Sequence, residues 1–61
     1  MYWITEYRND GRMSFYADTE SDVANLPTSQ NSQDVKKGSD CFVIETSDVY
    51  ILNSQDTWVK I

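Results

Sequence analysis

The sequence lacks histidine altogether and has a single cysteine, Cys41, among its 61 residues. Without histidine there is no Ser-His or Cys-His pair, the arrangement that commonly activates a protein nucleophile. One cysteine allows no disulfide within the chain, and with no histidine beside it a Cys/His zinc set is excluded. These absences predict a protein that is not an enzyme and that holds no metal and no cofactor.

Glycine and cationic residues are also scarce. Two glycines, Gly11 and Gly38, are too few for a glycine-rich phosphate loop. Ten acidic and five basic side chains give a net charge of −5, which opposes binding to the phosphates of nucleic acid. No apolar run approaches the roughly 20 residues that span a bilayer, and residues 1–6 do not resemble a signal peptide. We therefore expect an acidic protein of the cytoplasm that binds neither nucleic acid nor membrane.

The length allows one small domain, residues 1–61. A domain of this size buries a smaller share of its surface than a larger one, so its stability is marginal without further support. Because a disulfide and a metal are excluded, that support has to come from good packing or from self-association.

The order of apolar and turn-forming residues predicts a mainly β fold of the small α+β kind. Residues 2–17 form an N-terminal β-hairpin, because aromatic and β-branched residues flank the turn signal Asp10-Gly11. A two-residue turn there pairs Thr5 with Tyr16. One face of the hairpin then carries Ile4, Met13, Phe15 and Ala17, and the other carries Trp3, Tyr7 and Tyr16.

A short helical turn and a polar loop follow the hairpin. Residues 18–27 form the turn, since Thr19 and Asp22 have the spacing of a capping box and the only proline of the chain ends the segment. Residues 28–40 form a polar surface loop in which Val35 is the only apolar anchor.

Residues 41–61 form a C-terminal three-stranded antiparallel meander, with turns at residues 47–48 and 54–56. These turns give the cross-strand pairs Ile44–Ile51 and Ile51–Val59. One face of the meander then collects six apolar residues, which predict the core: Phe42, Ile44, Val49, Ile51, Val59 and Ile61. The opposite face collects Val43, Tyr50, Leu52 and Trp58.

This second face has too many large apolar side chains for a surface in contact with water. Exposed apolar patches mark interfaces, and tyrosine and tryptophan are preferred there. The contact residues we expect are Trp3, Val43, Tyr50, Leu52 and Trp58. The alternative is that the N-terminal hairpin folds over this face within one chain. The edge formed by residues 57–61 adds a second route to self-association, by strand pairing.

Four segments of the chain together resemble a small module of tailed-bacteriophage and prophage structural proteins. They are an acidic helix start that ends in Leu-Pro, a Gly-Ser-Asp entry into an apolar strand, a Val-Tyr strand that ends in Asn, and a Trp-Val pair. They occupy residues 17–27, 38–44, 46–53 and 58–59. The chain departs from the module in its Gln/Asn/Ser-rich spacer at 28–34 and at Asp56-Thr57, where the module often has a glycine.

The resemblance implies a non-enzymatic structural protein of the virion, associated with the head or the tail. Such a protein is made in the cytoplasm of the bacterial host, and its partners are copies of itself and other virion proteins. Self-association suits this role, because virion components assemble by repetition. The alternative function is a small acidic inhibitor, encoded by a phage, that binds a basic site on a host or defence protein. Binding of that kind weakens steeply with salt.

Overall fold

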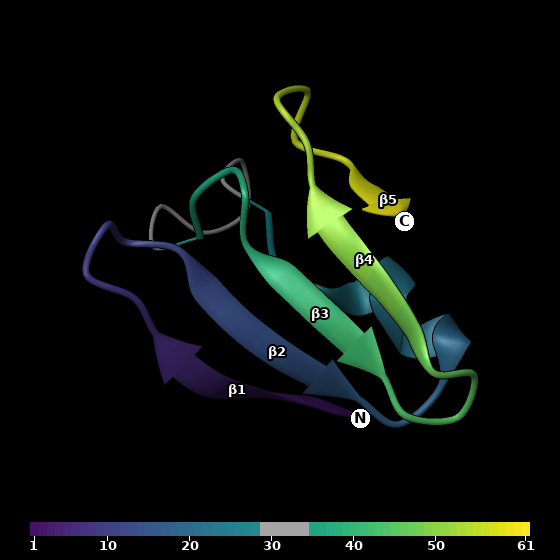
Figure 1. Ribbon diagram of the computed structural model, residues 1–61. Helices are drawn as coiled ribbons and strands as arrows, with labels where there is room; N and C mark the ends of the chain where they lie inside the picture. The colour runs from purple at the N-terminus through teal and green to yellow at the C-terminus, as the bar shows by residue number, and fades with distance from the viewer. Residues whose placement is uncertain (29–34) are drawn as a thin grey trace.

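The chain forms a single sheet in which the order of the strands follows the sequence. A computed structural model describes residues 1–28 and 35–61, and Figure 1 shows its five strands. The strands are β1 (Tyr2–Tyr7), β2 (Met13–Ala17), β3 (Asp40–Val43), β4 (Asp48–Leu52) and β5 (Trp58–Lys60), and the 3-10 helix η1 (Glu20–Asn25) follows β2. The mainly β fold, with an N-terminal hairpin, one short helical turn and a C-terminal meander, is therefore confirmed.

The hairpin and the meander join through the central pair of strands, β2 and β3, which run parallel. The other three neighbouring pairs are antiparallel. A parallel pair requires a crossover connection. The described parts of this connection that pack on the sheet, η1, Leu26 and Val35, lie on one side of it. The hairpin thus extends the meander sideways within one sheet. The alternative that it folds over a face of the meander is wrong.

The predicted helical turn begins with the capping box that the sequence indicated. The Thr19 backbone N–H donates to the Asp22 carboxylate at 3.1 Å, and the Asp22 N–H donates to the Thr19 carbonyl at 3.1 Å. After the turn, Leu26 is buried, and the Pro27 carbonyl accepts a hydrogen bond from Trp58 Nε1 at 3.1 Å. These contacts hold the crossover segment against one face of the sheet, which we call the inner face.

The core lies between the inner face and the crossover segment. Val35, the predicted apolar anchor of the polar loop, is among its buried members. Residues 29–34 of that loop lie outside the described residues. Trp58 packs on the core, with its ring centroid 5.9 Å from that of Phe15 and the two planes at 90°. The buried apolar side chains are Met13, Phe15, Ala17, Leu26, Val35, Cys41, Val43, Tyr50 and Leu52.

Ser39, a polar residue directly before β3, is completely buried. Its hydroxyl accepts a hydrogen bond from the Met13 N–H at 3.0 Å and donates one to the Lys36 carbonyl at 2.6 Å. This hydroxyl therefore fastens the start of β2 to the end of the crossover segment. Burial of a hydroxyl is tolerated here because both of its hydrogen-bonding roles are used.

The turn of the hairpin is longer than predicted. Arg8 and Arg12 close it, since the Arg8 N–H donates to the Arg12 carbonyl at 2.8 Å, and Gly11 adopts a φ of +93°. This matches a three-residue loop with a left-handed glycine and not the predicted two-residue turn. The longer turn and an irregularity further along β1 together pair Tyr16 with Trp3 and not with Thr5.

An irregularity between Ile4 and Glu6 then changes the direction of the side chains in β1. Tyr7 pairs with Met13, so its position belongs to the inner face, and the prediction that Tyr7 shares a face with Trp3 is wrong. The position of Ile4 opposite Phe15 agrees with the prediction. A single bulge is enough for this change, because neighbouring side chains of a strand point to opposite faces.

The meander keeps the predicted division of side chains between its two faces. Ile51 pairs with Val59 as expected. The turn between β3 and β4 is longer than predicted, with Ser47 at a φ of +59°, so Phe42 pairs with Val49 and the predicted pair Ile44–Ile51 is wrong. Since the register moves by an even number of residues, each side chain stays on its predicted face.

The identity of the core face is reversed. The six residues predicted as the core (Phe42, Ile44, Val49, Ile51, Val59 and Ile61) are partly or fully exposed, and the core includes Val43, Tyr50 and Leu52 from the opposite face. The reason lies in the crossover from β2 to β3, which carries η1, Leu26 and Val35 to the Tyr50 side of the sheet. Both faces of the meander are apolar, so its periodicity did not reveal which one this segment covers.

Candidate functional site

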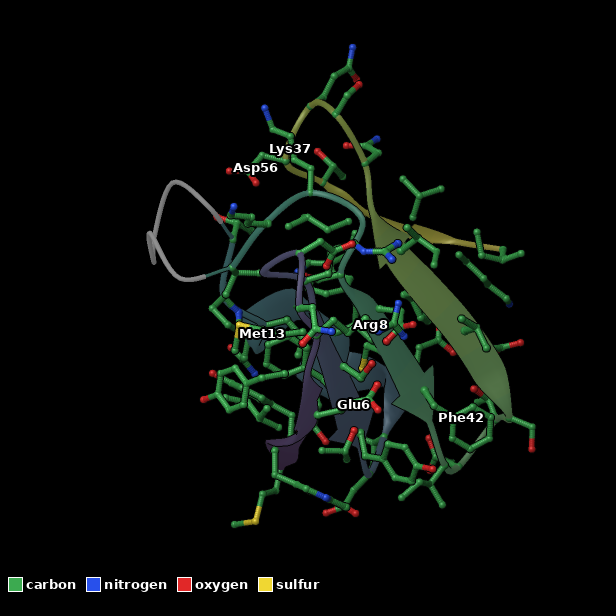
Figure 2. All side chains as sticks on the ribbon, turned by 60° about the vertical axis from the view of Figure 1, so that its left-hand side comes forward. Glu6, Arg8, Met13, Lys37, Phe42 and Asp56 are labelled. Carbon is green, nitrogen blue, oxygen red and sulfur yellow. The ribbon has the colours of Figure 1, made fainter. Side chains whose placement is uncertain are left out.

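The face of the sheet opposite η1 has no covering element among residues 1–28 and 35–61. We call it the open face. Figure 2 shows the two sides of the sheet through its labelled residues, with Met13 on the core side and Phe42 on the other. A row of five side chains crosses the open face from β1 to the end of the chain, and successive members lie on paired positions of neighbouring strands. The row consists of Trp3, Tyr16, Phe42, Val49 and Ile61.

The aromatic half of this row forms a continuous group of rings. The ring centroids of Trp3 and Tyr16 are 6.0 Å apart, and those of Tyr16 and Phe42 are 5.7 Å apart. Trp3 is 41% exposed and Tyr16 is 42% exposed, although both side chains already contact neighbouring rings. The two pairs of rings are tilted, with interplanar angles of 49° and 54°, and their separations lie in the range in which aromatic pairs attract each other. The row is therefore a preformed surface on which another apolar surface can pack.

A second row of paired positions crosses the open face, and the part of it on β1, β2 and β3 is polar. Glu6, Ser14 and Asp40 occupy paired positions on β1, β2 and β3. Arg8 lies over them: its Nη2 donates to Asp40 Oδ2 at 2.8 Å and to Ser14 Oγ at 3.0 Å, and its Nε donates to Glu6 Oε1 at 3.5 Å. The Asp40 carboxylate raises the pKa of the Arg8 guanidinium above its ordinary value by Coulombic attraction.

A shallow hollow lies between the two rows. Its volume is about 420 Å³, and it is open to solvent along the sheet. Figure 2 places Glu6 and Arg8 on the same side of the sheet as Phe42. Its walls offer aromatic rings, three hydroxyls and two carboxylates, so it can receive both apolar and polar groups of another surface. The lining residues are Thr5, Glu6, Ser14, Phe15, Tyr16, Asp40, Phe42 and Val49.

The residues expected to form a contact surface are divided between the two faces. Val43, Tyr50 and Leu52 are 0%, 8% and 1% exposed, so they are core residues and their placement on an exposed surface was wrong. Trp58 is partly buried and packs against the same core. Trp3 alone lies on the open face. The structure therefore exchanges the buried and exposed roles of the two predicted faces, and of the predicted contact residues it leaves only Trp3 on the open face.

The polar cluster around Arg8 was not found by sequence reasoning. Arg8 and Asp40 are 32 positions apart in the chain, and only the parallel pairing of β2 with β3 brings them together. The five-residue hydrophobic row was visible in part. The meander pattern grouped Phe42, Val49 and Ile61 correctly, although it assigned them to the core.

Cys41 is enclosed in the core of the folded chain. Its side chain is fully buried, and burial raises the pKa of its thiol to about 11. Cys41 serves as a small apolar residue of the core. Within residues 1–28 and 35–61, no group of three or more acidic or cysteine side chains is arranged to hold a metal ion. No helix in the same part of the chain is long and apolar enough to cross a membrane.

Comparisons with protein-family models, with curated proteins and with solved structures gave no match.

Proposed function

We propose that this protein is a non-enzymatic structural module that associates with copies of itself through the open face. One observation carries the proposal: the row from Trp3 to Ile61 crosses the whole sheet and is left partly exposed by the described residues. Covering the row would remove apolar surface from water and so stabilise the associated state, by about 25 cal/mol for each Å². A 61-residue domain with one thin core gains much from such a contact.

The sequence resemblance supports a place for this module in a virion, associated with the head or the tail. Structural proteins of that kind are used in many copies, and repeated use of one surface is how closed or fibrous assemblies form. The acidic composition keeps the free chain soluble before it assembles in the cytoplasm of the bacterial host. Other virion proteins are the further partners under this proposal.

A small phage-encoded inhibitor of a host or defence protein is the second candidate. The observation in its favour is the group of carboxylates at one end of the sheet, where Asp18, Glu20 and Glu45 lie near the ends of β2 and β3. Such a group suits a basic site on another protein. Under this candidate the chain stays monomeric, and its binding weakens steeply as salt is added. Mass spectrometry of purified virions separates the two candidates, since an inhibitor is absent from them.

The test of self-association uses Val49, the second residue of β4 and a member of the exposed row. The native mass of the wild type and of the variant Val49→Lys is measured by light scattering after size exclusion, over a range of protein concentrations. The wild type should show a discrete multiple of 7.1 kDa. Val49→Lys should be a monomer, because the lysine charge would lose its water in the contact.

The matched control is Val49→Thr, which keeps the β-branched shape and adds no charge. It should fold like the wild type by circular dichroism and should still associate, although more weakly. A wild type that is monomeric at every concentration would contradict the proposal. Equal masses for Val49→Lys and the wild type would show that association uses another surface.

A further inference from the structure

Charged side chains are distributed unevenly along the strands. One end of the sheet, where β2 and β3 finish, carries five carboxylates and one side-chain ammonium, that of Lys60, which pairs with Asp48 at 3.3 Å. The side chains there carry a formal charge of −4. The Met1 amino group lies against two of the carboxylates. We call this the acidic end, and its carboxylates are Asp18, Glu20, Asp22, Glu45 and Asp48.

The opposite end carries four of the five basic side chains. A Cβ on Gly11 would lie 2.8 Å from Lys36 Cδ, and a Cβ on Gly38 would lie 3.0 Å from Arg12 Cδ. The hairpin turn and the loop before β3 are therefore in contact, and they gather these cations at one end, as Figure 1 shows from the course of the two segments. We call this the lysine end, and its basic residues are Arg8, Arg12, Lys36 and Lys37.

The lysine end is neutral overall. Its four cations are matched by the carboxylates of Glu6, Asp10, Asp40 and Asp56. The acidic end at −4 and the neutral lysine end leave one negative charge of the net −5 to be assigned. This charge belongs to Asp34, which lies outside the described residues. Within the described part of the chain, Lys36 and Lys37 make no ion pair, so their ammonium groups can donate to carboxylates of a second molecule.

The size of the open face limits the contact that two copies can make. The two longest extents of the whole molecule are 27 and 21 Å, so the open face covers no more than roughly 570 Å². Two copies would bury up to about 1,100 Å² together, which is close to the roughly 1,000 Å² of a small specific interface. A second copy suits this face, because both partners then offer the same apolar row.

Two sheets that pack face to face lie about 10 Å apart with their strands nearly aligned. A two-fold axis along the strands would bring the two acidic ends together. An axis across the strands would place each acidic end opposite a lysine end. The screening length at physiological salt, about 8 Å, is close to the distance between the sheets, so repulsion between acidic ends would still be felt.

From this charge asymmetry we infer that a second copy covers the open face with its strands reversed, so that the acidic end of each copy faces the lysine end of the other. The inference rests on the proposed function, because it concerns the pairing of the same face. A two-fold axis along the row stacks each row residue on its own counterpart, Phe42 on Phe42 and Trp3 on Trp3. Contacts of this isologous kind close a dimer and leave no open face.

Spin labels at the two ends of the sheet test the orientation. One label is attached at Glu45→Cys in the acidic end and another at Lys37→Cys in the lysine end, both at exposed positions. Cys41 stays unlabelled because it is fully buried. Dipolar distances between copies are then measured for each variant alone and for their mixture.

The reversed arrangement predicts that the mixed 45-to-37 distance is the short one. A five-residue strand spans about 17 Å. The 45-to-45 and 37-to-37 distances should therefore exceed the mixed 45-to-37 distance by about 10 Å or more. Short distances at equal positions and a long mixed distance would overturn the inference while leaving self-association in place. A wild type that is monomeric, or spin-labelled samples with no distance between copies, would overturn the proposed function as well.

Discussion

Truncation of Trp58 tests whether the inner face is the core of a single chain or a contact surface between chains. Its ring packs edge-on against Phe15, its Nε1 donates to the Pro27 carbonyl, and β5 consists of only three residues. If the inner face is the core of one chain, truncation of this ring must weaken the fold. If the inner face were a contact surface between chains, truncation would weaken association and leave the fold intact.

The expected cost of Trp58→Ala follows from these contacts. Removal of a fully buried large aromatic ring costs about 3–5 kcal/mol, and the partial exposure of Trp58 places it near the lower end. The lost hydrogen bond to Pro27 contributes about 1 kcal/mol of that cost. A core in a domain of this size supplies about 3–5 kcal/mol in all, so the variant should be largely unfolded at 25 °C.

The assay is urea unfolding followed by far-ultraviolet circular dichroism at low protein concentration. Trp58→Phe keeps the ring contact with Phe15 and loses the hydrogen bond, so its free energy of unfolding should fall by about 1 kcal/mol. Trp3→Ala is the matched control, because the other tryptophan of the chain lies on the open face and its loss should cost little in the monomer. An unchanged unfolding midpoint for Trp58→Ala, together with lost association, would refute the assignment of the core.

Two further predictions concern polar groups that hold the fold. Ser39→Ala removes the acceptor of the buried Met13 N–H and should lower the free energy of unfolding by about 1–3 kcal/mol; an unchanged urea midpoint would show that another group serves this N–H. A hydrogen bond from the Thr46 side chain lowers the pKa of Asp48. Because the folded-state pKa is the lower one, the stabilisation is complete above the unfolded value near 4 and is lost as the pH falls through the folded value. Urea midpoints measured between pH 3 and pH 7 should therefore decline below about pH 4, and less steeply for Asp48→Asn; equal slopes would exclude this contribution.

Local patterns in the sequence were sufficient for the elements of the fold. Alternating apolar residues, the turn signals and the Thr19–Asp22 capping box depend on neighbours within a few positions, and each produced the expected strand or helical turn. The pair Ile51–Val59 followed in the same way from a short turn. These features are set by backbone preferences and by the two-residue period of a strand.

The core face depends on a contact between distant parts of the chain. Both faces of the meander carry large apolar residues, and the choice between them is made where Leu26 and Val35 pack. That packing follows from the parallel pairing of β2 with β3, which no local signal indicates. Ser39 shows the same limit, because a serine in a polar loop gives no sign that its hydroxyl bridges two buried backbone groups.

The most direct test of the open face as the contact surface compares two tyrosines. Tyr16 belongs to the exposed row, whereas Tyr7 ends β1 and is 72% exposed. Hydroxyl-radical labelling of both is measured by mass spectrometry as the protein concentration rises through the range in which the native mass increases. Our account predicts that labelling of Tyr16 falls as the chains associate while labelling of Tyr7 stays constant. Constant labelling of Tyr16 during association would contradict it.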